Sequence, residues 1–232
     1  MSSLLLDNLN KIRLRIEAAA SRAGRDPAAV GLVVVTKYAP LESVKEVLES
    51  GLVREVGENR VQDAQRKKEA LGALADSVRW RLIGRLQTNK AKQALRNFSA
   101  IDSVDSLKLA AELDRAWTGE KPFPVLVQVK LSEKETQSGI APEQLEELLS
   151  GLAKLPRLTV GGLMSLAPML EPVEAVRPHF RRMRELFERF FAHKKDARLS
   201  MGMSRDFEIA VEEGATLVRV GSAIFPVSGS TE

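Results

Sequence analysis

The sequence predicts an α/β protein built as a single (β/α)8, TIM-type barrel with an extra helix at its N-terminus. Short apolar runs rich in β-branched residues alternate with longer amphipathic stretches, and eight such runs fit into 232 residues. Alternating strands and helices build a parallel sheet, and eight strands in this length are typical of a closed barrel. An open, doubly wound sheet is the alternative. It is disfavoured because the first run ends in Thr36-Lys37-Tyr38, without the G-x-G-x-x-G turn of a dinucleotide site.

The first predicted element is a helix from residue 3 to about residue 23. Its apolar residues recur every three or four positions, and most of its charged residues fall on the opposite side, so that one face is apolar. Gly24 and the pair Asp26-Pro27 end this helix, because glycine and proline both interrupt helical structure.

After this helix, each predicted strand is a short run of mostly apolar residues, and each predicted helix is a longer segment with one apolar face. The predicted strands are Gly31–Thr36, Val53–Val56, Trp80–Ile83, Ser99–Ile101, Val125–Val129, Leu158–Val160, Arg198–Met201 and Thr216–Val220. The predicted helices are Leu41–Ser50, Asn59–Ala73, Thr88–Leu95, Ser106–Trp117, Pro142–Ala153, Val173–Phe191, Arg205–Glu213 and a short final segment after Gly221. No low-complexity linker or duplicated half interrupts this order, so residues 1–232 are expected to form one domain.

Composition argues against several classes of function. Lys and Arg number 35 against 31 Asp and Glu, a net charge of +4, and aromatic residues make up only 5%, which disfavours a stacking surface for single-stranded nucleic acid. With no cysteine and 2 histidines, neither a cysteine nucleophile nor the usual zinc site is expected. No apolar run approaches the roughly 18 residues that cross a bilayer, and early charges argue against a signal peptide. We therefore expect a cytoplasmic protein that binds neither nucleic acid nor membrane.

The first predicted strand ends directly before a candidate nucleophile, Lys37. In an α/β barrel the functional groups lie at the carboxyl ends of the strands. An apolar surrounding disfavours the charged ammonium form, which makes a lysine available as an imine-forming nucleophile. The alternative is an ordinary lysine that reaches solvent at the end of a strand.

The turns after strands two and three carry polar residues on the predicted rim of a pocket. Strand two continues into G-E-N-R-V-Q from Gly57 to Gln62, and strand three into I-G-R-L-Q-T-N-K from Ile83 to Lys90. Glu58 has a second interpretation, as a carboxylate at a helix N-terminus that is stabilised by the helix dipole. Alone, neither turn identifies a site.

The turns after strands seven and eight predict a site for a phosphorylated ligand. Strand seven leads into S-M-G-M-S, which ends at Ser204, and strand eight leads into Gly221-Ser222-Ala223. Small and hydroxyl-bearing residues before a helix leave backbone N–H groups available to an anion, and in barrels these two turns often bind phosphate together. The alternative is that both are only tight turns between a strand and a helix.

Six motifs in chain order resemble the YggS-type pyridoxal-phosphate-binding homeostasis proteins, whose fold is similar to the barrel domain of alanine racemase, the fold type III of pyridoxal phosphate proteins. These motifs lie between Val33 and Phe225 and so cover nearly the whole chain. They are V-V-V-T-K-Y, G-E-N-R-V-Q, W-R-L-I-G-R-L-Q-T-N-K, G-L-M-S-L-A-P, L-S-M-G-M-S-R-D and V-R-V-G-S-A-I-F.

The resemblance implies a cofactor, pyridoxal 5′-phosphate, and a set of residues that bind it. Lys37 would hold the cofactor as an internal aldimine, and Arg219 would face its pyridine nitrogen. Asn59 would line the pocket near the ring. The residues implied to bind phosphate are Met201, Gly202, Met203, Ser204, Gly221 and Ser222, and those matching the pocket-side motif of strand six are Met164 and Ser165.

Two positions depart from the family pattern. Arg81 follows Trp80 where the family usually has histidine, and Pro226 follows Phe225 where it usually has glycine. The first departure puts in doubt any role that depends on that histidine, and the second concerns only the closing turn.

The function implied is intracellular homeostasis and supply of pyridoxal phosphate by a non-catalytic monomer, with apo-enzymes that depend on this cofactor as expected recipients. An arginine only donates to the pyridine nitrogen, which then stays unprotonated and makes the ring a weaker electron sink.

Two enzymatic functions are the alternatives. A pyridoxal-phosphate-dependent amino acid racemase needs an acid or base on each face of the α-carbon, and the second domain that supplies the opposing tyrosine in alanine racemase is expected to be missing here. A phosphosugar aldolase with a Schiff-base lysine also suits the barrel. It is disfavoured because such lysines usually lie on a later strand.

Overall fold

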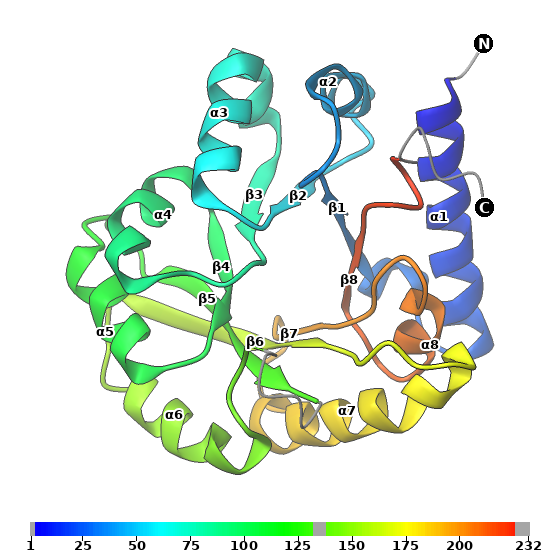
Figure 1. The fold of residues 1–232 in the computed structure, drawn as a ribbon. Helices are drawn as coiled ribbons and strands as arrows, with labels where there is room; N and C mark the ends of the chain where they lie inside the picture. Colours follow the sequence, from blue (N-terminus) through cyan, green and yellow to red (C-terminus); the bar gives the residue numbers. More distant parts are fainter. Residues whose placement is uncertain (1–2, 132–137, 226–232) are drawn as a thin grey trace.

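The computed structural model describes residues 3–131 and 138–225 and shows a closed barrel of eight parallel strands in the order β1 to β8. Helices surround this barrel on the outside, and the N-terminal helix lies next to the last helix (Figure 1). The predicted (β/α)8 barrel with an additional N-terminal helix is therefore confirmed. Pro226 lies outside the described residues.

The elements follow one another in the predicted order. The strands are β1 (Gly31–Val35), β2 (Glu55–Glu58), β3 (Arg79–Leu82), β4 (Ala100–Val104), β5 (Phe123–Lys130), β6 (Leu158–Leu166), β7 (Arg198–Ser200) and β8 (Leu217–Val220). The helices are α1 (Leu4–Arg22), α2 (Leu41–Glu49), α3 (Val61–Leu71), α4 (Ala91–Asn97), α5 (Leu107–Ala116), α6 (Leu145–Leu152), α7 (Arg177–Phe191) and α8 (Phe207–Glu212). The short 3-10 helices are η1 (Pro27–Ala29), η2 (Gly72–Ser77), η3 (Thr88–Lys90), η4 (Pro142–Gln144) and η5 (Val173–Val176).

Several predicted boundaries are wrong. The second strand starts and ends two residues later than predicted, which makes Glu58 its last residue rather than part of a helix start. Strand β6 continues to Leu166 instead of ending before the pair Gly161-Gly162. Gly162 is needed there because β7 passes so close that a Cβ atom would lie 2.0 Å from the carbonyl oxygen of Arg198.

Another difference lies near the C-terminal end of the described residues. The segment after Gly221 forms a turn over residues 222–224 rather than a helix. The backbone N–H groups of Ile224 and Phe225 both donate to the Gly221 carbonyl, which closes that turn. Helix α8 also begins two residues after the predicted start at Arg205.

Side chains on the outer face of the barrel form the main hydrophobic core with the helices. Val34, Val56 and Leu82 belong to this core, as does Trp80, whose indole N–H donates to the Ala75 carbonyl at 2.9 Å. Because side chains alternate along a strand, the neighbours of these residues point into the barrel. The outer core thereby fixes which residues face the barrel interior.

The barrel interior contains charged residues beside apolar ones. Cross-strand partners place Val33 of β1 beside both Glu55 and Arg219, and Gly57 beside Arg81, so these side chains share the inner face. Asp102 lies on the same face, because it is two residues from Ala100, the partner of Arg81. Charged residues inside a barrel need partners, since an isolated buried charge is costly.

Arg81, one of the two departures from the family pattern, has such partners. Its guanidinium donates from Nε and Nη2 to the two carboxylate oxygens of Asp102 at 2.8 Å and 2.6 Å, and from Nη1 to Glu55 at 3.4 Å. Burial alone would lower the pKa of Arg81, but the neighbouring carboxylates outweigh burial and raise it. Among basic side chains, only the planar guanidinium group of arginine forms a bidentate ion pair of this kind.

The extra helix α1 covers the outside of α8. Its residues Leu9, Ile12 and Ile16 are buried, and Ser3 caps its start by accepting the Leu6 N–H. The Arg15 guanidinium pairs with Glu208 of α8 at 2.7 Å. No helix within the described ranges is long and apolar enough to cross a membrane.

Candidate ligand-binding site

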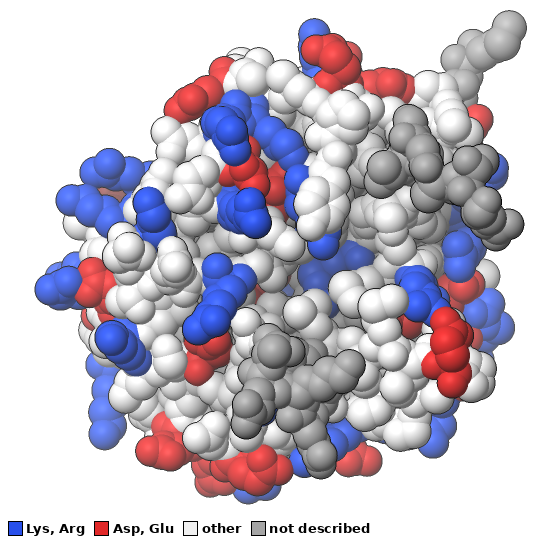
Figure 2. Space-filling view, viewed as in Figure 1, with Lys and Arg blue, Asp and Glu red and all other residues white. Residues whose placement is uncertain are grey.

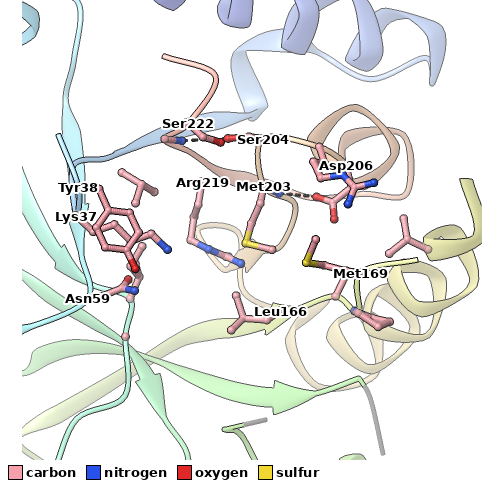
Figure 3. Close-up of a pocket in the computed structure, with 18 of the residues that line it drawn as sticks. Lys37, Tyr38, Asn59, Leu166, Met169, Met203, Ser204, Asp206, Arg219 and Ser222 are labelled. Atoms are coloured by element: carbon pink, nitrogen blue, oxygen red, sulfur yellow. Dashed lines mark hydrogen bonds between the residues drawn. The ribbon is translucent and has the colours of Figure 1, made fainter. Parts of the chain in front are cut away.

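A pocket of about 740 Å³ opens at the carboxyl ends of the strands, where the sequence predicts the functional groups (Figure 3). Its volume lies within the range typical of small-molecule sites. The lining residues come from nearly every strand end. They are Val35, Lys37, Tyr38, Ala39, Asn59, Ile83, Gly84, Arg85, Gln128, Ser138, Leu166–Leu170, Val173, Val176, Met203–Asp206, Arg219, Gly221, Ser222 and Phe225.

Lys37 and Tyr38 follow β1 on one wall of this pocket. They occupy the middle of a turn that is closed by a hydrogen bond from the Ala39 N–H to the Thr36 carbonyl, 3.0 Å long. The Lys37 ammonium lies 5.0 Å from the centre of the Tyr38 ring. Both side chains are exposed, so the apolar surrounding that the sequence predicted does not enclose the ammonium group.

Arg219 forms the floor of the pocket from the inner face of β8. It is only 2% exposed, and its guanidinium donates to the Ser200 hydroxyl and to the Ser165 carbonyl, each at 2.7 Å. No carboxylate within the described residues pairs directly with it, and burial lowers its pKa to about 10, which leaves it charged at neutral pH. Figure 3 shows the Lys37 and Arg219 side chains directed into the same space. A buried cation with unused N–H groups is suited to a polar acceptor in the pocket.

The turns after β7 and β8 meet on the opposite wall. Ser204 Oγ accepts the Gly221 N–H at 3.3 Å, and Asp206 accepts the Met203 N–H at 2.6 Å (Figure 3). Gly221 fits against β1, because a Cβ atom there would lie 2.9 Å from the Val35 carbonyl oxygen. The backbone N–H groups of Ser204 and Ser222 have no partner within the described residues. Two unpaired donors beside two hydroxyls form a suitable site for a phosphate group.

The charge around the pocket favours an anionic ligand. Four lining residues are basic and one is acidic; they are Lys37, Arg85, Arg205 and Arg219 against Asp206. Burial is the largest influence on Asp206 and raises the pKa of its carboxyl group. Figure 2 shows Lys and Arg atoms in the hollow at the middle of this face of the molecule.

Seven of the eleven residues predicted from sequence to bind the cofactor line this pocket, and four do not. Met164 and Ser165 lie buried in β6, and the Ser165 carbonyl supports Arg219 from below. Met201 belongs to the outer hydrophobic core. The Gly202 carbonyl accepts the backbone N–H of Arg219 at 3.0 Å, so this residue joins the turn after β7 to β8 and does not line the pocket.

Most of the apolar residues that line the pocket were not predicted from the sequence. Leu166 ends β6, and the other apolar lining residues of this region come after it; the predicted end of the strand was six residues too early. The turn with Ile83 and Arg85 was expected on the pocket rim, but neither residue was assigned a role, and Gln128 was not predicted to line the pocket. Their position directly after or at the end of a predicted strand was the available signal.

The arrangement can hold a small planar molecule that carries both an aldehyde and a phosphate. Lys37 offers a primary amine, Arg219 offers donors to a ring nitrogen, and the turns at Ser204 and Ser222 offer donors to phosphate oxygens. These residues therefore fit pyridoxal 5′-phosphate, the cofactor that the sequence resemblance implies.

Fold and site together define a barrel of the alanine racemase type, with a lysine at the end of its first strand. The family model described as alanine racemase, N-terminal domain, matches residues 8–228, so the chain belongs to that family. A pyridoxal phosphate homeostasis protein from Aquifex aeolicus is 42% identical over 222 residues, which cover 94% of this chain and 96% of the relative.

Two solved structures are similar as well. PipY of Synechococcus elongatus with PLP bound has a TM-score of 0.75 and 34% identity, covering 91% of this chain and 99% of that one. Alanine racemase from Clostridium difficile has a TM-score of 0.74, and the match covers 97% of this chain but 57% of that one. At 16% identity, the second likeness shows the fold alone.

Proposed function

We propose that this chain binds pyridoxal 5′-phosphate covalently through Lys37 and serves in homeostasis and supply of the cofactor rather than in catalysis. The observation that carries the proposal is that Lys37 shares one pocket with a buried guanidinium and with two unpaired backbone donors. The names of the relatives support the same cofactor.

Each lining group has a separate task in this binding. The bound cofactor supplies an aldehyde on an electron-withdrawing ring. Lys37 would hold the cofactor through its amine nitrogen, bonded to the former aldehyde carbon with loss of one water molecule. The turns at Ser204 and Ser222 hold the phosphate, and Arg219 donates to the ring nitrogen.

A carrier is favoured over a racemase because of the groups that surround Lys37. Racemisation requires a second proton-exchanging group across the substrate carbon from the lysine. Tyr38 stands beside Lys37 in the same turn, and Asp206 already accepts the Met203 N–H. The Arg219 guanidinium donates only, so the ring nitrogen stays unprotonated, which disfavours transamination but would still allow a racemase.

This proposal includes a setting and a recipient for the cofactor. We place the protein in the cytoplasm as a monomer, with apo-enzymes that depend on pyridoxal phosphate as its recipients. The exposure of Lys37 and Tyr38 at the mouth of the pocket supports exchange of the cofactor with the surroundings.

Incubation of the loaded protein with single-enantiomer amino acids in deuterated water tests the non-catalytic role. Because the described residues place no acid or base opposite Lys37 that is free of other hydrogen bonds, we expect no significant α-deuteration, inversion, transamination or decarboxylation of alanine, serine or other common amino acids. Chiral chromatography and mass analysis detect each of these, and an alanine racemase serves as the positive control. Rapid α-deuteration with inversion that disappears in Lys37→Ala would establish the racemase instead.

The substitution Ser222→Asp is expected to weaken binding of pyridoxal 5′-phosphate by at least about tenfold, because a charge-assisted hydrogen bond contributes roughly 1.5–3 kcal/mol. Binding of unphosphorylated pyridoxal should change little. Equilibrium titration of both ligands measures this, with Ser150→Asp as the control, since Ser150 is exposed on α6. Equal losses for the two ligands would show that phosphate does not bind at this turn.

A further inference from the structure

Behind the pocket wall, a buried carboxylate joins β1, β2 and α3. Glu58 is fully buried, and its Oε1 accepts the Thr36 hydroxyl at 2.7 Å and the Lys67 ammonium at 2.6 Å. Lys67, which lies on α3, also donates to the Thr36 carbonyl. Its side chain is 14% exposed, so the ion pair is largely shielded from water.

This group of three residues lies outside the pocket but next to two residues that line it. Glu58 at the end of β2 contacts both Thr36, which follows β1, and Lys67 of α3. The sequence neighbours Lys37 and Asn59 instead line the pocket. The Thr36 carbonyl that Lys67 binds is the same atom that accepts the Ala39 N–H and closes the turn carrying Lys37. The Lys67 ammonium thus holds one end of the turn that presents Lys37.

The hydrogen bonding of the buried Glu58 carboxylate is incomplete. Its second oxygen, Oε2, is buried and has no hydrogen-bond partner among the described residues. Replacing a buried ion pair by apolar residues of similar size often leaves the stability of the protein unchanged. The presence of such a pair is therefore weak evidence for a purely stabilising role. The hydrogen bonds of Glu58 to Thr36 and Lys67 instead fix the relative positions of the β1 and β2 ends.

We propose that Glu58 and Lys67 are positioning residues that hold the Thr36–Ala39 turn and thereby direct the Lys37 amine toward the aldehyde of the bound cofactor. This inference rests on the proposed function, because it concerns the amine that would bond to the cofactor. The bond itself forms as described above, with loss of one water molecule. Glu58 and Lys67 contribute no atom to it.

Stopped-flow mixing of apo-protein with pyridoxal 5′-phosphate measures how fast the imine absorbance appears. Lys67→Met should slow this step by at least about tenfold, because misplacing a reacting group by about 1 Å costs about a hundredfold. Pyridoxamine 5′-phosphate has no aldehyde and reports on the other contacts alone. Its dissociation constant should be unchanged in Lys67→Met.

Lys68→Met is the matched control, since Lys68 is the next residue on α3 and donates to the Asn97 carbonyl at 3.1 Å, away from the turn. It should form the imine at the wild-type rate. Glu58→Gln, which keeps the size of the side chain and an acceptor for Thr36, should slow the step as well. It replaces Lys67→Met in the comparison if the latter does not fold.

Wild-type imine rates in both Lys67→Met and Glu58→Gln would overturn the positioning role. Equal losses of imine formation and of pyridoxamine 5′-phosphate binding would overturn it as well, because they indicate general damage to the pocket. If wild type and Lys68→Met also form no imine, the proposed function fails, and the role of Glu58 and Lys67 fails with it.

Discussion

The cofactor-loaded protein is expected to show a visible absorption band, and Lys37→Ala is expected to abolish it. Lys37 is the only lysine that lines the pocket within the described residues, so no other amine stands ready to bond to the aldehyde. Absorption spectra of both proteins after addition of pyridoxal 5′-phosphate and removal of the excess measure the effect. Lys92→Ala, an exposed position on α4, should keep the band.

The same variant separates the covalent bond from the remaining contacts. Ser204, Ser222 and Arg219 are unchanged in Lys37→Ala, so pyridoxamine 5′-phosphate should still bind to it. A visible band of wild-type intensity in Lys37→Ala would contradict the role of this lysine.

Arg81→Met is expected to lower the free energy of unfolding by about 3–5 kcal/mol, the usual cost of leaving one member of a buried ion pair alone. Asp102 is fully buried and accepts both of its strong hydrogen bonds from Arg81. For a chain of this length, such a loss lowers Tm by roughly 6–20 °C. Thermal unfolding followed by circular dichroism measures it.

The double variant Arg81→Met/Asp102→Leu is the control for this prediction. It removes both charges, so it should unfold at a higher temperature than Arg81→Met, since replacing a whole buried pair is often nearly neutral. If Arg81→Met unfolds at the wild-type temperature, the ion pair does not stabilise the barrel interior.

The fold was predictable because the pattern repeats. Eight apolar runs alternate with amphipathic segments, and an error of a few residues in one strand does not change that order. The family motifs also placed the correct turns together, and Lys37, Ser204, Arg219 and Ser222 all line one pocket. Turns at the ends of parallel strands meet at one end of a barrel whatever their separation in sequence.

Other features depend on details that a single sequence does not display. Whether Glu58 begins a helix or ends a strand depends on a shift of two residues, and that shift decides whether its side chain reaches Lys67. The contact between Arg81 and Asp102 depends on the register of β3 and β4. The burial of Met201 depends on which face of β7 meets the helices.

The apolar residues that line the pocket after β6 were not predicted, for a related reason. The pair Gly161-Gly162 reads as the end of a strand, because glycine weakens isolated strands. In the barrel, β7 approaches closely at Gly162, and β6 runs on to Leu166. The residues after Leu166 therefore lie at a strand end that sequence reasoning had placed elsewhere.

Peptide mapping after borohydride treatment tests the central claim most directly. Borohydride reduces the carbon–nitrogen double bond and leaves the pyridoxyl group permanently attached to the amine that formed it. Mass spectrometry of the digested, cofactor-loaded protein should then find this group on Lys37 and on no other lysine. A pyridoxyl group on a different lysine, or none after loading, would contradict the account.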